Sequence, residues 1–388
     1  MEWKEVTLGE ITNLVIDYRG KTPLKLGSSW SDSGYRALSA KNIKTGQIVA
    51  EDSIRFVDEE LYRKWMKDEV NRGDILITSE APFGQIYYWD SDEKIVLSQR
   101  LFDVRLNDEV CHKYVYYFMT SHRYQKDLEG RATGTTVTGL RQPELLKSTI
   151  LLPPLSAQRS ISSILSSLDR KIELNNKINA DLEEMAQAIF KNWFVDFEPF
   201  KGGKFVDSEL GMIPEGWKVV KLGDFFPVKT GKKDANTASV NGKYPFFSCS
   251  QNALCTDSYS FDCDAILVAG NGDFNVKWYS GKFDAYQRTY VLIPYNKKLL
   301  ALLYYVVKRN LLTITSKARG SVIRFITKGN LTDFEFAIPR DLENNEIVDV
   351  FKSINEKIFA NIKENSRLSL LRNTLLPRLM SGELEVPE

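Results

Sequence analysis

Basic and hydrogen-bonding side chains occur in short loops at comparable places in two halves of the chain. The loops at 18–21, 229–233 and 317–320 each carry lysine or arginine and no acidic residue. Lysine and arginine contact phosphate groups, while arginine, serine, threonine, asparagine and glutamine can also recognise donors and acceptors on base edges. Any one such loop is most simply a solvated turn. Their recurrence in both halves favours a surface that binds nucleic acid.

Ten residues combine such side chains with a loop position and are candidate DNA contacts. They are Arg19, Lys21, Lys41, Arg100, Thr135, Lys232, Gln251, Arg288, Arg319 and Arg324. Arg100 and Arg288 recur in similar motifs, so they could equally belong to a frame that the two halves share. The loops at 133–136 and 319–321 could place hydroxyl and backbone N–H groups against a phosphate, or could be simple turns between helix and strand.

The residue patterns of known catalytic and metal sites do not occur in this sequence. The two histidines, His112 and His122, fall in one predicted helix and have no equivalents in the other half. There is no H-E-x-x-H, G-x-S-x-G or G-x-x-x-x-G-K-[ST] pattern, and no C-x-x-C pair among the four cysteines. The sequence therefore predicts that the protein is not an enzyme, has no catalytic or metal-ligating residues and binds no cofactor itself.

The composition is typical of a two-domain protein without membrane segments. The 388 residues, 43% of them hydrophobic, suffice for two cores of ordinary size. Because the start lacks a secretion signal and no apolar run could span a bilayer, we expect a cytoplasmic protein with reduced cysteines and no membrane partner. The net charge is only +1, from 52 basic and 51 acidic residues. This balance does not exclude a polyanionic partner, because acids and bases can concentrate on separate surfaces.

The chain repeats itself with a constant shift. Residues 132–135 correspond to 318–321, a shift of 318 − 132 = 186, and the similarity continues into the segments that follow. The two halves also open alike, at 3–11 and 217–225. A repeat this long that occurs only twice is not a solenoid. It predicts a pseudo-twofold molecule built from two similar halves.

Each half is expected to mix strand and helix. Runs of β-branched and apolar residues at 74–78 and 265–268 predict strands, and longer stretches at 114–128 and 299–310 predict helices. In contrast, residues 26–56 have no convincing counterpart in the second half. Similar frames with dissimilar insertions indicate one scaffold that presents two different surfaces.

Each half ends in a long predicted helix with an apolar seam. The helices are expected at 156–194, with Ser156 as the N-cap, and at 342–380, with a kink or a terminating turn at Pro377. At about 1.5 Å per residue, the first would be about 55–60 Å long. The seam positions recur at alternating steps of four and three residues, as in a coiled coil. They are Ile161, Leu165, Leu168, Ile172, Asn175, Asn179, Leu182, Ala186, Ile189 and Trp193, and Ile347, Phe351, Ile354, Ile358, Asn361, Asn365, Leu368, Arg372, Leu375 and Leu379.

Asparagine occupies two successive seam positions in each helix: Asn175 and Asn179, then Asn361 and Asn365. A buried amide without a partner costs roughly 1–3 kcal/mol, so we expect these side chains to hydrogen-bond between the helices and fix their register. The alternative is an ordinary amphipathic helix whose amides face water. Antiparallel pairing would bring the asparagines opposite one another and carry the two halves to opposite ends, whereas parallel pairing would place both at one end.

Three motifs resemble a known family, the specificity (S) subunits of Type I restriction-modification systems. They are Trp-Phe-Val-Asp-Phe-Glu-Pro-Phe at 193–200, Gly-Met-Ile-Pro-Glu-Gly-Trp at 211–217 and Leu-Leu-Pro-Arg-Leu-Met-Ser-Gly at 375–382. The resemblance covers essentially the whole chain. It implies an α+β fold in which two pseudo-twofold-related mixed α/β target recognition domains are separated by a long antiparallel two-helix coiled coil.

The resemblance also implies a function and partners. Each recognition domain would read one half of a bipartite target in double-stranded DNA, and the helix pair would set the gap between the halves. The chain would have no catalytic activity. It would recruit two methyltransferase (M) subunits, which use S-adenosylmethionine to methylate adenine, and through them restriction (R) subunits that use ATP and Mg²⁺.

The resulting division of the chain has five parts. We expect recognition domains at 1–152 and 211–338, spacer helices at 153–195 and 339–388 (the latter including the C-terminal tail), and a linker at 196–210. The helices and the domain flanks would dock the methyltransferase. Two alternatives stay open: an orphan or regulatory S subunit, and a coiled-coil scaffold whose globular ends bind proteins.

Overall fold

The computed structural model describes residues 3–134, 138–239 and 242–386. Contacts divide the chain into two compact units, one formed by Met1–Glu173 with Asn365–Glu388 and the other by Leu174–Glu364. Each unit contains one globular part and a portion of both long helices, α5 (Leu155–Phe194) and α9 (Glu346–Met380). The division therefore falls inside the long helices.

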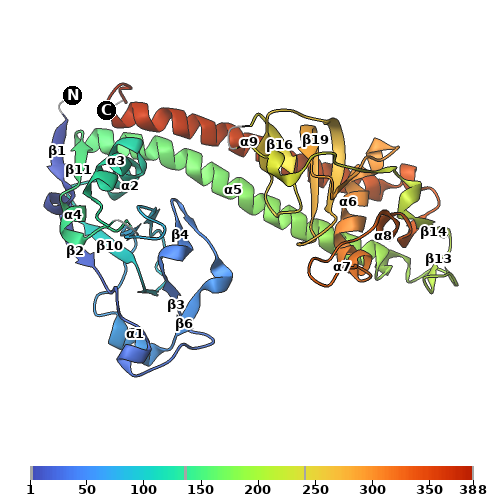
Figure 1. Ribbon diagram of the computed structural model, residues 1–388, viewed down its shortest axis with the longest axis horizontal. Helices are drawn as coiled ribbons and strands as arrows, with labels where there is room; N and C mark the ends of the chain where they lie inside the picture. The colour runs from blue at the N-terminus through green and yellow to red at the C-terminus, as the bar shows by residue number, and fades with distance from the viewer. Residues whose placement is uncertain (1–2, 135–137, 240–241, 387–388) are drawn as a thin grey trace. The chain divides into compact units, whose positions relative to one another are not determined.

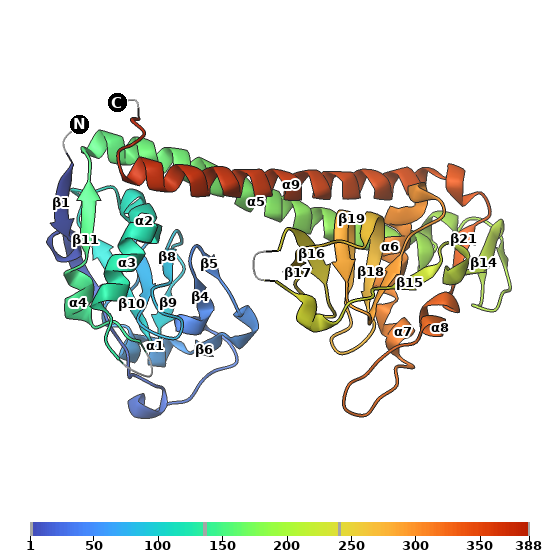
Figure 2. The same ribbon diagram turned by 45° about the horizontal axis from the view of Figure 1, so that its top comes forward.

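The first unit is built around a four-stranded antiparallel sheet with the order β2-β10-β7-β8. Except for β7, its strands and the helices that follow are labelled in Figure 1 or Figure 2. They are β2 (Thr12–Ile16), β7 (Ile75–Thr78), β8 (Ile86–Tyr88), β10 (Leu101–Leu106), α2 (His112–Thr120) and α3 (His122–Arg131). Successive residues of β7 enter different cores: Ile75 and Ile77 pack with α2, and Leu76 packs in a second cluster with Trp65. The sheet is thus covered on both faces, as expected for alternating side chains.

A smaller three-stranded sheet, β6-β3-β9, joins strands from the stretch 26–56, which lacks a counterpart in the sequence repeat, to the later strand β9. The elements here are η2 (Leu24–Leu26), β3 (Tyr35–Leu38), β4 (Ile43–Lys44), β5 (Gln47–Ile48), β6 (Arg55–Val57), α1 (Glu59–Trp65) and β9 (Ile95–Leu97). Trp65, at the end of α1, is fully buried and its indole N–H donates to the Leu97 carbonyl at 3.1 Å. Trp65 belongs to a cluster that also contains Leu76 and Leu101, so these elements pack against one face of the four-stranded sheet.

The second unit repeats the strand order of the first and then extends it. Its six-stranded sheet has the order β15-β20-β18-β19-β16-β17, of which the first four strands match β2-β10-β7-β8. The elements are β15 (Val228–Thr230), β16 (Tyr244–Phe247), β17 (Leu254–Thr256), β18 (Phe261–Ala269), β19 (Val276–Ala285), β20 (Thr289–Leu292), α6 (Leu300–Arg309) and α7 (Leu311–Thr315). Figure 2 shows α6 beside β18 and β19. The two halves share a frame and differ in what is added at its edge.

Each half is closed by pairing of its first strand with its last. In the first unit β1 (Lys4–Thr7) pairs antiparallel with β11 (Thr149–Leu152), and in the second β14 (Trp217–Lys221) pairs with β21 (Glu335–Pro339). The short helices before the last strands, α4 (Gln142–Leu146) and α8 (Lys328–Thr332), also correspond. In the sequence between the two halves, β12 (Phe205–Val206) pairs with β13 (Ile213–Pro214). The closure brings the chain back to its starting point just before each long helix.

Several helix boundaries differ from the sequence predictions. The stretch 114–128 is two helices, because the backbone breaks at Ser121, whose hydroxyl caps α3 by accepting from the Tyr124 N–H at 3.4 Å. The second long helix, α9, begins at Glu346 after a 3-10 turn. It also runs through Pro377 to Met380, so Pro377 does not terminate it. Pro377 cannot donate a helical hydrogen bond to the Asn373 carbonyl, yet the helix continues for three residues beyond it.

The predicted seams are the covered faces of both long helices: every seam position is buried or half-buried. In the second unit the Asn361 amide donates to Asn179 Oδ1 at 2.8 Å, and the Asn175 amide donates to Glu364 Oε2 at 2.8 Å. Asn175 and Asn361 are 0% and 1% exposed, so these amides do not face water. Residue numbers rise along α5 as they fall along α9, so the contacting segments of this unit are antiparallel.

In the first unit the same two helices also meet. Arg372 Nη1 of α9 lies 2.7 Å from Asp169 Oδ1 of α5, and Leu375 and Leu379 belong to the same hydrophobic cluster as Leu165. Asn365 is half-buried. That the asparagines fix register remains a prediction. Within the described ranges, no helix has the length and apolar character needed to cross a bilayer.

The amide pair Asn179–Asn361 can be tested by a double-mutant cycle. Asn361→Leu leaves Asn179 Oδ1 without its 2.8 Å donor, so we expect the free energy of unfolding to fall by about 1–3 kcal/mol. The double variant Asn179→Leu/Asn361→Leu should recover most of that loss, because apolar contact replaces the bond. Chemical denaturation of all four proteins measures the coupling. Strictly additive losses of unfolding free energy in the two single variants and the double variant would contradict an interaction between the amides.

A buried carboxyl lies in the middle of β10. Asp103 is 0% exposed and is close to Asp74, which accepts two hydrogen bonds from the Arg105 guanidinium, at 2.7 and 3.0 Å. Burial, together with the negative charge of Asp74, raises the pKa of Asp103 well above its usual range. The corresponding region of the second unit has Val291 at this position of β20. The acid is therefore a property of the first unit alone.

Asp103 should make the stability of the first unit depend on pH. Because its pKa is higher in the folded than in the unfolded protein, its contribution is fully present below the unfolded value of about 3.9 and declines by about 1.4 kcal/mol per pH unit until the folded value is reached. We expect Asp103→Asn to flatten the profile of unfolding free energy from pH 4 upwards. The exposed carboxyl Asp52 supplies the control, Asp52→Asn. Parallel profiles for Asp103→Asn and the unaltered protein would show that Asp103 does not titrate as described.

Candidate nucleic-acid interface

Three loop segments of the first unit are joined by main-chain hydrogen bonds. Ser79, at the end of β7, donates its N–H to the Arg100 carbonyl at 2.8 Å and accepts from the Leu140 N–H at 2.9 Å. Thr133 and Gly139 exchange two bonds of 2.9 Å, which closes the loop between α3 and α4 into a hairpin. The candidate loops therefore meet at one end of the sheet.

The same bonds occur in the second unit. Gly270, at the end of β18, donates its N–H to the Arg288 carbonyl at 2.8 Å and accepts from the Ile326 N–H at 2.9 Å. Arg319 and Phe325 exchange two bonds of 2.8 Å. The hairpin residues are again 186 positions apart from their counterparts, since 319 − 133 = 186 and 325 − 139 = 186. One backbone frame thus presents the candidate side chains of both units.

Arg19 and Arg100 are brought together in the first unit, each with an acidic partner. Arg19 pairs with Asp17 at 2.7 Å and lies over the Phe102 ring, 4.1 Å from its centroid. Arg100 Nε lies 2.9 Å from Glu80 Oε1, and its backbone φ of 65° is in the left-handed region. All four charged residues line one hollow of about 320 Å³. Asp17 and Glu80 were not predicted as site residues, because neither pairing follows from residue spacing.

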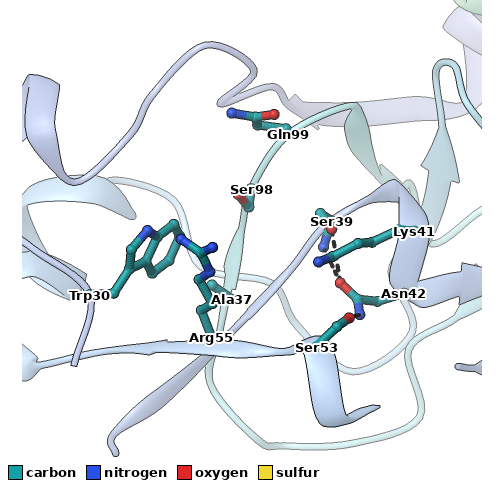
Figure 3. A pocket seen from close by; sticks show the side chains of 9 residues that line it. All are labelled: Trp30, Ala37, Ser39, Lys41, Asn42, Ser53, Arg55, Ser98 and Gln99. Atoms are coloured by element: carbon teal, nitrogen blue, oxygen red, sulfur yellow. Dashed lines mark hydrogen bonds between the residues drawn. The ribbon is translucent and has the colours of Figure 1, made fainter. Parts of the chain in front are cut away.

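Lys41 lines a second hollow of about 240 Å³, in which Gln99 also takes part. Figure 3 shows the Lys41 side chain beside Ser39 and Asn42, and the Arg55 guanidinium against Trp30, whose centroid is 5.3 Å from Cζ. Gln99 lines this hollow and also the one that contains Arg19 and Arg100. Arg55 and Trp30 were not predicted; both lie in the insertion that has no counterpart to compare.

Lys21 is directed into the protein. Its ammonium donates to the Trp65 carbonyl at 2.7 Å and lies 3.9 Å from the Tyr18 ring centroid. Burial lowers the pKa of Lys21. These contacts indicate that Lys21 has a structural role, unlike Arg19, which lines the hollow. Thr135, in the first hairpin, lies outside the described residues, so its predicted contact is untested.

Three arginines of the second unit surround the base of its hairpin, and all are exposed. The Arg288 guanidinium lies 5.9 Å from the Phe325 ring centroid, and Arg324 Nη2 donates to the Thr315 carbonyl at 3.1 Å. Arg319 is held by its main chain to Phe325. Among the described residues, no acidic side chain forms an ion pair with any of the three. This unit therefore presents its arginines differently from the first.

The remaining candidates lie on neighbouring segments. The Gln251 amide donates to Asp273 Oδ2 at 2.5 Å, which ties the 249–251 loop to the turn between β18 and β19. Lys232 is exposed next to Lys233, whose carbonyl accepts from the Gln287 N–H at 2.9 Å. Lys232 therefore adjoins the Arg288 segment, and the 249–251 loop also reaches it, since Cys249 Sγ donates to the Arg288 carbonyl at 3.6 Å. Lys277, which donates to the Ser250 carbonyl at 2.7 Å, was not predicted because it lies inside a strand.

The described part of the chain does not bring together side chains that could hold a metal ion. Within residues 3–134, 138–239 and 242–386, no cluster of three or more His, Cys, Asp or Glu side chains has suitable geometry. The four cysteines are free thiols. His112 Nε2 lies 3.1 Å from the Asn107 carbonyl, in the turn before α2, which accounts for it structurally.

Comparison with known proteins identifies the duplicated frame. Residues 1–184 and 214–368 each match the model of the Type I restriction modification DNA specificity domain. The chain belongs to this family. Because the matched regions contain the first and the second frame respectively, the sequence repeat is a repeat of this domain. The expected resemblance to Type I specificity subunits is confirmed.

Individual relatives of the chain support this family assignment. The chain is 30% identical over 349 residues to the Type I restriction enzyme MjaIX specificity subunit of Methanocaldococcus jannaschii, covering 82% of this chain and 79% of the relative. It is 40% identical over 178 residues to the EcoDI specificity subunit of Escherichia coli, but this match covers only 45% of the chain and 40% of the relative. The closer similarity is therefore confined to part of each protein.

The fold of this specificity subunit is also found in a crystal structure. The S subunit of a Type I restriction-modification system from M. genitalium superposes with a TM-score of 0.63 at 15% identity, and the superposition covers 97% of this chain and 96% of that one. At this identity the likeness concerns the fold: mixed α/β domains with long helices.

The contrast between Lys21 and Lys41 gives a prediction. Lys21→Ala removes a charged hydrogen bond to the main chain and a cation–π contact, so we expect the free energy of unfolding to fall by about 1 kcal/mol. Lys41→Ala, at an exposed position, should change it by less than about 0.5 kcal/mol. Thermal and chemical denaturation compare the two. Equal stabilities for both variants would contradict the structural role of Lys21.

Proposed function

We propose that this specificity subunit is a non-catalytic DNA-binding subunit that recognises a bipartite target in double-stranded DNA. Each recognition domain, 1–152 and 211–338, reads one half of the target. The main support is that one hydrogen-bonded backbone frame occurs twice. The equivalent arginines of the two copies have different side-chain partners: Arg100 is paired with Glu80, whereas Arg288 lies over Phe325. A duplicated scaffold with different side chains suits two different half-sites.

The side-chain chemistry supports DNA as the ligand. Arginine can donate two bonds to guanine, and glutamate can accept from the cytosine amino group, so Arg100 and Glu80 offer both partners of a G·C pair a contact. Gln99 and Gln251 carry amides of the kind that bind adenine. Lys41, Lys232 and the arginines supply phosphate contacts that position the domains.

The long helices would form the antiparallel coiled coil that sets the gap between the half-sites. Support comes from the covered seams and from the amide contacts of Asn175 and Asn361. The helices also keep apolar side chains exposed: on α9, Leu370 is 69% and Leu371 46% exposed. Exposed apolar patches mark protein contacts, so we assign this surface to docking of the methyltransferase subunits.

The rest of the system would lie in partner subunits. Two M subunits would bind S-adenosylmethionine and methylate adenine, and R subunits with ATP and Mg²⁺ would join through the complex. The catalytic residues would then belong to those subunits. Relatives carry the name of restriction enzyme subunits, which supports these partners. The assembly would act in the cytoplasm, where the DNA is.

Salt dependence separates DNA binding from a protein scaffold, whereas the neighbouring genes would distinguish an orphan or regulatory subunit. For the subunit assembled with its M partners, we expect the logarithm of the DNA affinity to fall steeply with the logarithm of the salt concentration. Arg319→Ala should weaken binding and reduce the slope by about 1. Lys218→Ala, an exposed basic residue on β14, is the matched control and should change neither. Binding without dependence on salt or sequence would favour the scaffold.

The spacer role predicts a change in the gap alone. Four residues inserted after Asn179 in α5, with four before Asn361 in α9, lengthen the helix pair by about 6 Å. Since base pairs are about 3.4 Å apart, we expect a gap longer by one or two base pairs and unchanged half-sites. Sequencing of the methylated sites in a host that carries the variant measures both. Altered half-sites with an unchanged gap would refute the spacer assignment.

A further inference from the structure

The hairpin between α7 and α8 ends in exposed apolar side chains. Val322 is 93% exposed and Ile323 is 59% exposed. In Figure 2 the segment that joins α7 to α8 extends beyond both helices before it returns. Two adjacent β-branched residues at the tip of a projecting loop gain nothing from the core of their own domain, so their exposure calls for a partner.

The hairpin is anchored at its base. Besides the two bonds between Arg319 and Phe325, the Arg324 carbonyl accepts from the Gly272 N–H at 2.9 Å. Gly320 has φ +98°, and a Cβ there would lie 2.2 Å from the Ile323 carbonyl oxygen, so the turn requires glycine. The base is therefore fixed to the turn between β18 and β19, and it holds the apolar tip outward.

The charge of the segment specifies the kind of partner. Residues 310–332 contain no aspartate or glutamate, and four basic residues: Lys317, Arg319, Arg324 and Lys328. Arg288 adds a fifth positive charge next to Phe325. An apolar tip with cationic flanks suits a polyanion that also presents apolar groups. Duplex DNA has this combination, with phosphates along both rims of a groove and thymine methyl groups inside it.

We propose, building on the DNA-binding function above, that this hairpin enters the major groove of one half-site and that Val322 and Ile323 contact the C5-methyl group of a thymine. The major groove, about 12 Å wide, admits elements as broad as an α-helix, whereas the minor groove is only about 6 Å wide, so the major groove suits a projecting loop of this kind. The thymine methyl is the apolar feature of the major-groove base edges. Arg319 and Arg324 then lie at the rims, against phosphates.

The first hairpin would have a different specificity. By the shift of 186, the counterparts of Val322 and Ile323 are Thr136 and Val137. Both lie outside the described residues. A hydroxyl in place of one isopropyl group replaces an apolar contact by a hydrogen-bonding group, so we expect the first half to prefer different base edges.

Replacement of thymine by uracil tests the proposal, because it removes the methyl group and leaves the pairing edge unchanged. The subunit assembled with its M partners is bound to its own target, and each thymine of both half-sites is replaced in turn. We expect one position, or two adjacent ones, in a single half-site to weaken binding about four-fold, the effect of exposing one buried methyl group. Val322→Ser/Ile323→Ser should bind the unmodified target about as weakly and show no further loss with uracil.

The controls separate this contact from general damage. Tyr295→Ser changes another exposed apolar residue of the same unit, 73% exposed and beyond the opposite end of β20 from Arg288, and should keep full uracil sensitivity. Co-purification with the M subunits and thermal denaturation check assembly and folding of both variants. Because Val322 and Ile323 are exposed, neither property should change.

Distinct outcomes would overturn the inference. Uracil sensitivity that persists in the hairpin variant, or its absence at every thymine of a target that the unaltered complex binds specifically, excludes the methyl contact. Loss of M-subunit binding by the variant would assign the tip to a protein. A DNA bend that is lost in the variant without any uracil effect would indicate a wedge between bases instead. Failure of the unaltered complex to prefer any sequence would refute the DNA-binding function itself.

Discussion

The structure depends on a main-chain closure that is made twice. β1 pairs with β11, and β14 pairs with β21, so that each globular half ends where it began. The Leu8 N–H bonds to the Ser148 carbonyl at 2.7 Å, and the Leu222 N–H to the Phe334 carbonyl at 2.8 Å, which locks the same turn in both. Because the last strand leads into a long helix, the closure fixes where that helix leaves its domain. Main-chain bonds do not depend on side-chain identity, so this arrangement can persist while the surface changes.

The candidate interface follows the same division between a constant backbone and variable side chains. Ser79 and Gly270 make the same two main-chain bonds although one is serine and the other glycine. The side chains around them diverge: the first unit neutralises its arginines with acids, and the second leaves Arg288, Arg319 and Arg324 without ion-pair partners among the described residues. Binding to DNA would therefore require the first unit to share or release its acidic partners, whereas the second is already cationic.

The sequence revealed the features that repeat and missed those that depend on tertiary contact. The shift of 186 and the two seams were visible because they are periodic, and the structure confirms that the seams are covered. The break at Ser121 was missed because Tyr114 to Leu128 is apolar on one face throughout, and only the cap reveals the change of direction. The inward course of Lys21 and the pairing of Arg100 with Glu80 depend on residues distant in the chain. No local pattern encodes them.

Sequencing of methylated bases in the genome of a host that carries this gene with its partner subunits would show whether each copy of the frame reads its own half-site. We expect one modified motif made of two defined half-sites separated by a fixed number of unspecified base pairs. A single undivided motif would contradict the assignment of one half-site to each copy of the frame, and methylation without any motif would contradict sequence recognition by this chain.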